Sequence, residues 1–203
     1  MISISPNVVD ITRDRNPMAP AILVVVGASG AGKTTLVRGL DALSLPGVHC
    51  YYFDTIGIPA QDDPRFADGE AFQFWALDQW VARLTRNEDG VEVAVLDAQV
   101  RPRAVYDAFA RYGITRGDVV LVDCDYAERN ARLHGPRGQG ELANAQMDCW
   151  AAYLRGQADA LGVPVLSTSG VQPESGVAFL RNRTARLQDP AGGEEGRLVP
   201  RDP

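Results

Sequence analysis

The sequence predicts an α/β fold in which a mostly parallel β-sheet lies between two layers of helices, a three-layer αβα arrangement. Two observations support this fold class. Five short apolar runs occur along the 203-residue chain, and a helical pattern separates each run from the next. Strands that alternate with helices imply right-handed crossovers and helices on both faces of the sheet. A chain of this length can bury one full core, so we expect a single domain.

The strands are expected at the apolar runs. The first run, AILVVV at 21–26, is continuous, which is typical of a strand buried on both faces. The other runs lie at 49–53, 91–96, 118–122 and 163–167. In a sheet of this kind, ligands bind beyond the carboxyl ends of the strands. The residues that follow each run are therefore the first candidates for a functional site.

The helices are expected at about 33–43, 69–86, 102–112, 126–134, 142–161 and 173–187. Within the pattern at 69–86, four apolar residues recur at helical spacing and should pack on the sheet. They are Phe74, Leu77, Val81 and Leu84. Asp125 precedes the pattern at 126–134 and has the residue type of an N-cap.

The ends of the chain differ in composition from its centre. Residues 1–19 are polar with scattered proline, and residues 188–203 are rich in glycine, proline and charge. Such segments bury too little apolar surface to offset the entropy of ordering. We therefore expect a flexible N-terminal segment, a domain over 20–187 and a disordered tail.

Cysteine usage and hydropathy indicate the compartment. The chain has three cysteines, Cys50, Cys124 and Cys149. Their odd number and wide spacing fit neither a disulfide framework nor a zinc site. No stretch approaches the ~20 apolar residues of a membrane span. We expect a soluble, cytoplasmic protein that does not bind membranes, and both a monomer and a homodimer remain open.

The net charge is −6, from 26 acidic and 20 basic residues. A negative balance disfavours indiscriminate binding to nucleic acid. A local basic face remains open, however, because four arginines fall in one region of the chain. They are Arg101, Arg103, Arg111 and Arg116. Nucleic acid is therefore an unlikely partner that the sequence does not exclude.

The segment GASGAGKT at 27–34 matches the phosphate-binding pattern G-x-x-x-x-G-K-[ST]. It follows an expected strand and opens an expected helix, which is the context the motif requires. Glycines let the backbone curl around an anion, and the helix adds the positive end of its dipole. The expected nucleotide-binding residues are Gly27, Ala28, Ser29, Gly30, Ala31, Gly32, Lys33, Thr34 and Thr35.

Lys33 is the only lysine in the chain, and every other basic residue is an arginine. A compact ammonium on a long stem fits among phosphate oxygens, whereas a planar guanidinium would crowd the loop. We expect Lys33 to contact the β- and γ-phosphates of ATP and to act in catalysis. Thr34 should give its hydroxyl to Mg²⁺.

Carboxylates follow three of the expected strands. Asp97 comes at the end of the run at 91–96 and is favoured over Asp123 as the second magnesium ligand. Asp54 follows the run at 49–53 and would receive or orient the proton of an attacking hydroxyl. A cap or turn role for Asp54 remains open.

Other candidate residues would line an acceptor site or close it. Gln99 and Arg101 follow Asp97 and would face the pocket, and Trp75 would contribute an aromatic wall. Packing or surface positions are open for all three. The segment at about 129–141 carries arginines and glycines, which suits a closing lid. Its best candidates for contact with the transferring phosphoryl group are Arg132 and Arg137.

With these motifs, residues 20–187 resemble the P-loop small-molecule kinases of the nucleoside-monophosphate kinase-like group. The motifs that carry the resemblance are GASGAGKT, LDAQVRP, DYAERNARL with a later arginine, and VLSTSG. The resemblance implies a five-stranded parallel P-loop NTPase sheet in the order 2-3-1-4-5 with a helical lid. It also implies that the segment from Ser167 to Gly170, including Ser169, lies near the base of ATP.

The segment FDTIG resembles the strand-2 aspartate region of the chloramphenicol phosphotransferase-like and gluconate or shikimate kinase-like members. Arg65 is the only basic residue of the acidic segment that follows it, a poor site for an acceptor phosphate. We therefore expect transfer of the γ-phosphoryl group of ATP, with Mg²⁺, to a hydroxyl of a small molecule. A nucleotide or a hydroxymethyl group on a nucleic-acid base remains open as the acceptor. A nucleotide-dependent switch without an acceptor is the alternative from another class.

Overall fold

The computed structural model describes residues 19–57, 69–135 and 138–189. Five strands form one parallel sheet in the order β2-β3-β1-β4-β5, which confirms the expected order. The strands are β1 (Ala21–Val26), β2 (Val48–Tyr52), β3 (Val93–Asp97), β4 (Gly117–Asp123) and β5 (Val165–Ser167).

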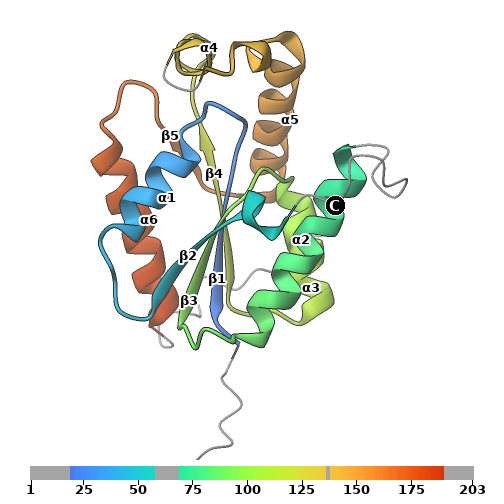
Figure 1. Ribbon diagram of the computed structural model, residues 1–203, viewed down its shortest axis with the longest axis vertical. Coiled ribbons are helices and arrows are strands. Elements are labelled where there is room, and N and C mark those ends of the chain that lie inside the picture. The colour runs from blue at the N-terminus through green and yellow to red at the C-terminus, as the bar shows by residue number, and fades with distance from the viewer. Residues whose placement is uncertain (1–18, 58–68, 136–137, 190–203) are drawn as a thin grey trace, which may run out of the picture.

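Helices cover both faces of the sheet. They are α1 (Lys33–Asp41), α2 (Gly69–Arg86), α3 (Pro102–Tyr112), α4 (Tyr126–His134), α5 (Ala145–Leu161) and α6 (Pro173–Gln188), with the short 3-10 helices η2 (Phe53–Ile56) and η4 (Gly140–Leu142). Helices α1 and α6 lie on one face and α2, α3 and α5 on the other, while α4 lies beyond the carboxyl ends of the strands (Figure 1). The three-layer prediction is confirmed.

The central strand β1 divides the core into two parts. Its side chains alternate, because successive residues of a strand point to opposite faces. Ile22, Val24 and Val26 pack with α2, α3 and α5, whereas Leu23 and Val25 pack with α1 and α6. Every residue of β1 is 0% exposed, so the loop that follows it starts from the fully buried centre of the sheet.

Side-chain caps fix where two helices near the carboxyl edge begin. The Asp125 carboxylate accepts a hydrogen bond from the backbone N–H of Glu128 at 2.8 Å, which confirms its expected capping role. Asn144 accepts from the backbone N–H of Met147 at 3.0 Å. The helix predicted at 142–161 therefore begins after Asn144, and the preceding residues form the separate turn η4.

The prediction that Phe74 packs on the sheet is wrong. Phe74 is 41% exposed. The indole of Trp80 is buried instead and donates a hydrogen bond to the carbonyl oxygen of Phe53 at 2.9 Å. The buried face of α2 consists of Ala76, Leu77, Trp80, Val81 and Leu84. This face is centred nearer Trp80, so Phe74 lies at its margin and is turned towards α3 and α5.

The last helix ends close to the predicted domain boundary at residue 187. Helix α6 ends one residue later than predicted, at Gln188, whose side chain donates to the carbonyl oxygen of Pro46 at 2.9 Å. The segments 1–18 and 190–203 lie outside the described residues. Across the described ranges, none of the helices combines the length and apolar character that a membrane crossing requires.

The burial of β1 predicts the cost of a cavity in the core. Leu23→Ala should lower the free energy of unfolding by about 2–5 kcal/mol, because the surrounding sheet and helices cannot collapse into the vacated space. Urea denaturation measures this change. Leu43→Ala is the matched control, since Leu43 is 46% exposed and its truncation should change stability by less than about 1 kcal/mol. Equal effects of the two substitutions would contradict the assigned core.

Candidate active site

The loop from Gly27 to Thr34 leaves the end of β1 and enters α1. Its three glycines have φ angles of 154°, 81° and 97°, at Gly27, Gly30 and Gly32. A β-carbon on Gly27 would lie only 2.2 Å from the backbone oxygen of Val122 in β4. Glycine is therefore required at this position both by the space and by the backbone angle. The loop has the curled form and the helix N-terminus that bind phosphate groups.

Lys33 is the first residue of α1, and it is 7% exposed. Its ammonium group donates a hydrogen bond to the carbonyl oxygen of Ala28 at 3.0 Å. The side chain therefore folds back over the loop that it follows. This position brings the only lysine of the chain to the phosphate-binding loop.

Thr34 and Asp97 meet at the foot of the loop. The Thr34 hydroxyl donates to a carboxylate oxygen of Asp97 at 2.6 Å. Hydroxyl and carboxylate oxygens are hard ligands of the kind that Mg²⁺ takes beside a nucleotide, so this pair fits the ion. Asp123 has other contacts, since it accepts from the N–H of Cys124 at 2.9 Å and pairs with Arg155 at 3.6 Å.

Arg132 lies over the other side of the loop. One nitrogen of its guanidinium donates to the hydroxyl of Thr168 at 2.8 Å and lies 3.4 Å from the carbonyl oxygen of Gly30. The other nitrogen donates to the carbonyl oxygen of Thr168 at 3.0 Å. The Thr168 hydroxyl in turn donates to the carbonyl oxygen of Ala31 at 2.9 Å. These bonds tie α4, the β5–α6 loop and the phosphate-binding loop together.

A carboxylate on α4 completes this connection. Glu128 accepts from Arg132 at 2.6 Å and from the backbone N–H of Gly170 at 2.8 Å. The hydroxyl of Ser169 accepts from the backbone N–H of Asp125 at 2.7 Å. The segment 167–170, which the family resemblance places near the base of ATP, thus lies against the first turn of α4.

Two buried groups beneath α4 support the loop. Burial raises the pKa of the Cys124 thiol, which keeps the thiol neutral, and its sulfur lies 3.8 Å from the carbonyl oxygen of Gly30. Arg129 is 5% exposed and donates to Asp148 of α5 at 2.7 Å. Arg129 therefore joins α4 to α5, and its stem lies beside Gly30 of the loop. The guanidinium that lies over the loop is that of Arg132.

The carboxyl ends of β2 and β3 lie at the same edge of the sheet as the phosphate-binding loop. In the sheet register, Tyr52 is aligned with Asp97, and Asp97 with Val25. Asp54 lies two residues beyond Tyr52 in η2, at the same edge of the sheet as the phosphate-binding loop, and its side chain is exposed. The Trp80 hydrogen bond to Phe53 holds this turn against α2.

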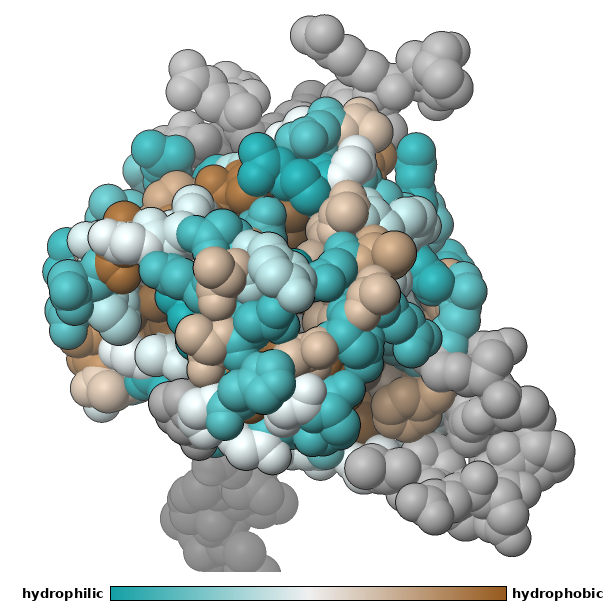
Figure 2. Space-filling model, turned by 90° about the horizontal axis from the view of Figure 1, so that it is seen from above, coloured by the Kyte–Doolittle hydropathy of each residue, from teal (hydrophilic) through white to brown (hydrophobic). Residues whose placement is uncertain are grey.

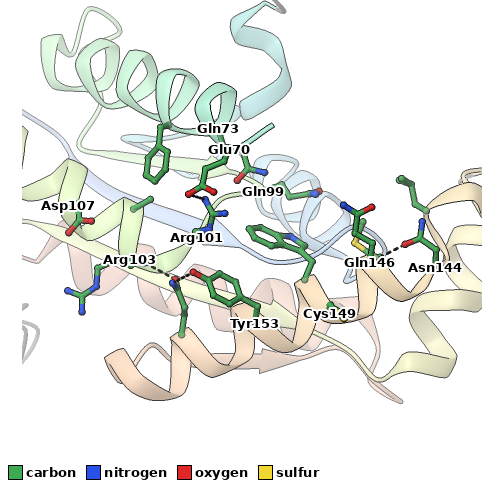
Figure 3. A pocket seen from close by; sticks show the side chains of 16 residues that line it. Glu70, Gln73, Gln99, Arg101, Arg103, Asp107, Asn144, Gln146, Cys149 and Tyr153 are labelled. Carbon is green, nitrogen blue, oxygen red and sulfur yellow. Dashed lines mark hydrogen bonds and ion pairs between the residues drawn. The ribbon is translucent and has the colours of Figure 1, made fainter. Parts of the chain in front are cut away.

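A cavity of about 830 Å³ lies between α2, α3 and α5 (Figure 3). Gln99 lines this cavity, and its side-chain oxygen accepts a hydrogen bond from the hydroxyl of Ser29 at 2.8 Å. The cavity therefore adjoins the phosphate-binding loop. Arg101 also lines it and forms an ion pair with Glu70 at 2.8 Å.

Seen from the carboxyl edge, the molecule is mostly hydrophilic, with hydrophobic residues visible between the hydrophilic ones (Figure 2).

Comparison with solved structures gives matches over most of both chains. Shikimate kinase from Acinetobacter baumannii, in complex with shikimate, is 15% identical with a TM-score of 0.53, covering 83% of this chain and 96% of that chain. The protein APE1195 is 22% identical with a TM-score of 0.54, covering 85% and 98%. The chain has the fold of the P-loop small-molecule kinases.

At these identities the likeness concerns the fold. A sugar kinase from Janibacter sp. HTCC2649 matches with 20% identity and a TM-score of 0.49, covering 85% of this chain and 98% of that chain. No protein-family model matches the sequence, and no curated protein matches it either. The roles of individual residues in this P-loop kinase fold therefore rest on their own geometry.

The structure brings together some of the residues that the sequence assigns to the site. Gln99 and Arg101 line one cavity beside the phosphate-binding loop. Trp75 is not among the described lining residues and instead contacts Phe72, with ring centroids 6.0 Å apart. The side chain of Thr35 lines a separate groove between α1 and α6. Arg137 lies outside the described residues, so its role and that of the lid remain predictions.

Sequence reasoning missed Glu128 and the contacts of Thr168, a residue of the segment 167–170 that the resemblance places near the base of ATP. Thr168 is 7% exposed and contacts both the phosphate-binding loop and Arg132. Glu128 holds Arg132 and Gly170 together. The capping pattern that begins at Asp125 contains Glu128, but nothing local in the sequence indicates that its carboxylate turns towards Gly170.

The close approach at Gly27 gives a testable consequence. Gly27→Ala should lower the free energy of unfolding by about 2 kcal/mol or more, because a β-carbon would overlap the Val122 carbonyl oxygen in an unfavourable backbone conformation. Gly156→Ala is the matched control, since Gly156 lies in α5 with no atom within 4 Å of the added carbon. It should raise stability by about 1 kcal/mol through helix propensity. Thermal and urea unfolding measure both changes. A change of the same sign in the free energy of unfolding of the two variants would contradict the close approach at Gly27.

Proposed function

We propose that the protein is an ATP- and Mg²⁺-dependent kinase that transfers the γ-phosphoryl group to a hydroxyl of a small molecule. The observation that carries this proposal is the Ser29–Gln99 hydrogen bond, because it joins the phosphate-binding loop to an adjoining cavity. A volume of about 830 Å³ is within the range of small-molecule sites. A nucleotide-dependent switch needs the loop but does not need such a cavity beside it.

The transfer forms a bond between the acceptor oxygen and the γ-phosphorus and breaks the bond from that phosphorus to the β–γ bridging oxygen. Catalysis then depends on positioning and charge. Lys33 and Arg132 would stabilise negative charge on the transferring group and on the leaving ADP. Asp54 would accept the proton of the attacking hydroxyl, and its exposed position at the carboxyl edge leaves it accessible to an acceptor.

Thr34 and Asp97 are the residues that would hold Mg²⁺, and their 2.6 Å hydrogen bond supports this assignment. When bound, Mg²⁺ would neutralise charge on the β- and γ-phosphates. The resemblance to these kinases would place Ser169 and Gly170 near the base, and Arg132 and Glu128 join their loop to the phosphate-binding loop and α4.

A nucleic-acid acceptor is less well supported by the charges of this surface. Arg101 is paired with Glu70 at 2.8 Å and Arg111 with Asp78 at 3.1 Å. Arg116 donates to the carbonyl oxygen of Leu187. These three arginines therefore have partners within the chain, whereas a basic face for a polymer needs free guanidinium groups.

The proposed role of Lys33 predicts a large loss of activity. Lys33→Ala should lower ATP-dependent phosphotransfer by about a thousandfold, because a fixed positive charge is removed from the transferring group. The rate of ADP production with a panel of alcohols, antibiotics, sugars and nucleosides as acceptors measures this loss of activity. Lys33→Arg should also lose most activity, since the wider guanidinium does not fit the loop.

Arg38→Ala serves as the control for the lysine variants. Arg38 lies on the same helix and is exposed, so this substitution should leave activity and folding unchanged. Circular dichroism should show the same fold in all three variants. Activity retained in Lys33→Ala would remove the role assigned to the lysine.

The proposed role of Asp54 predicts a split between turnover and nucleotide affinity. Asp54→Asn should lower kcat by about a hundredfold or more, because the amide cannot accept the proton. The Kd for ATP, measured by calorimetry, should change by less than about threefold. Asp159→Asn, an exposed position on α5, is the control for the same chemical change. Equal losses in turnover and ATP affinity would instead indicate a structural role for Asp54.

A further inference from the structure

The cavity beside the phosphate-binding loop contains the guanidinium of Arg101, whose charge is paired with the carboxylate of Glu70. The guanidinium of Arg101 lies 2.8 Å from the Glu70 carboxylate, and Figure 3 shows Glu70 reaching it from α2. Arg101 is 19% exposed as a side chain. An incoming carboxylate or phosphate would therefore have to displace Glu70 before it could form a paired ion bridge with this arginine.

Aromatic rings surround the same guanidinium. Its central carbon lies 5.8 Å from the ring centroid of Phe74, 5.4 Å from Trp150 and 5.8 Å from Tyr153, which are distances of cation–π contacts. Trp150 and Tyr153 stack with an interplanar angle of 23°. Phe74 and Tyr153 remain 41% and 46% exposed. The cavity thus offers flat apolar surfaces that a ring of a ligand can cover.

The remaining lining residues add hydrogen-bonding capacity without net charge. The charged groups of the described lining are two acids, Glu70 and Asp107, and two bases, Arg101 and Arg103, so their formal charges cancel. The other polar lining residues are mostly amides, Gln73, Gln99, Asn144, Gln146 and Gln157. Amides donate and accept hydrogen bonds and suit a polar but uncharged ligand.

From these contacts we infer that the acceptor is a neutral alcohol carrying a flat aromatic or heteroaromatic ring, and that the Arg101–Glu70 pair selects against acidic acceptors. The inference rests on the proposed function, because it names the acceptor of the same kinase site. The ring would stack in the cavity between α2 and α5, and the amides would bind its polar substituents. The hydroxyl would then extend past Gln99 towards the phosphate-binding loop.

Cys149 offers a readout of this cavity that does not depend on turnover. It lines the cavity and is exposed, whereas Cys50 and Cys124 are buried. Burial also raises the pKa of the Cys50 thiol to about 12, so alkylation by N-ethylmaleimide should occur at Cys149. With Mg²⁺ and a non-hydrolysable ATP analogue present, uridine and benzyl alcohol are the neutral probes. Uridine monophosphate, para-(hydroxymethyl)benzoate and gluconate are the acidic probes.

We expect the neutral ring alcohols to slow alkylation about tenfold at ten times their Kd, and the acidic probes to give little protection at the same concentrations. Protection by the acidic probes that equals or exceeds that of the neutral ones would overturn the inference. So would the absence of protection by both neutral probes. Calorimetry of ATP binding separates the two proposals. ATP binding without protection refutes only the acceptor class, whereas no ATP binding refutes the kinase function.

A charge substitution tests the selecting pair directly. Glu70→Gln leaves Arg101 without its carboxylate, so affinity for para-(hydroxymethyl)benzoate should rise about tenfold while affinity for benzyl alcohol stays the same. Glu88→Gln is the matched control, because it removes a surface pair of the same length, Arg86–Glu88 at 2.8 Å, outside the cavity. An unchanged preference in Glu70→Gln, with folding intact by circular dichroism, would refute the role of the pair.

Discussion

The contact between Gly27 and the carbonyl oxygen of Val122 decides how the chain leaves the centre of the sheet. Any larger residue would place a β-carbon 2.2 Å from that oxygen. The backbone therefore turns at this point, and the following amides curl before α1 begins. Because β1 lies between β3 and β4, the turn is within reach of Asp97 on one side and of the β5–α6 loop on the other. The Thr34–Asp97 pair and the contacts of the β5–α6 loop with the phosphate-binding loop both depend on this one close approach.

The fold was predictable from sequence because its signals are local and strong. The five apolar runs were each placed within two residues of the observed strands, and the phosphate-binding loop is a contiguous motif whose context could be checked on either side. The error at Phe74 arose where the signal was weak. Helix α2 carries aromatic residues on several sides, and periodicity alone does not distinguish the buried face from its margin. The burial of Trp80 against Phe53 decides this, and that contact joins two separate elements.

The candidate site was predictable only where its residues follow a motif or a strand end. Thr34 and Asp97 met this condition, and so did Gln99. Thr168 also follows a strand, β5, but its contacts were not predictable, because its bond to Ala31 joins residues 137 positions apart. The environment of Arg101 is likewise assembled from α2 and α5, so its rings and its carboxylate partner become visible only in three dimensions. Chemical roles such as the proton acceptance by Asp54 depend on a bound acceptor and remain proposals.

The carboxylate of Glu128 links two elements of the candidate site. One of its oxygens binds Arg132 and the other binds the backbone of Gly170, so helix α4 and the β5–α6 turn share a single anchor. Thermodynamic linkage requires that a ligand which stabilises the position of one of these two elements through the shared anchor also stabilises the position of the other. A ligand that contacts α4 would thereby favour the same position of the β5–α6 turn, because Glu128 joins the two.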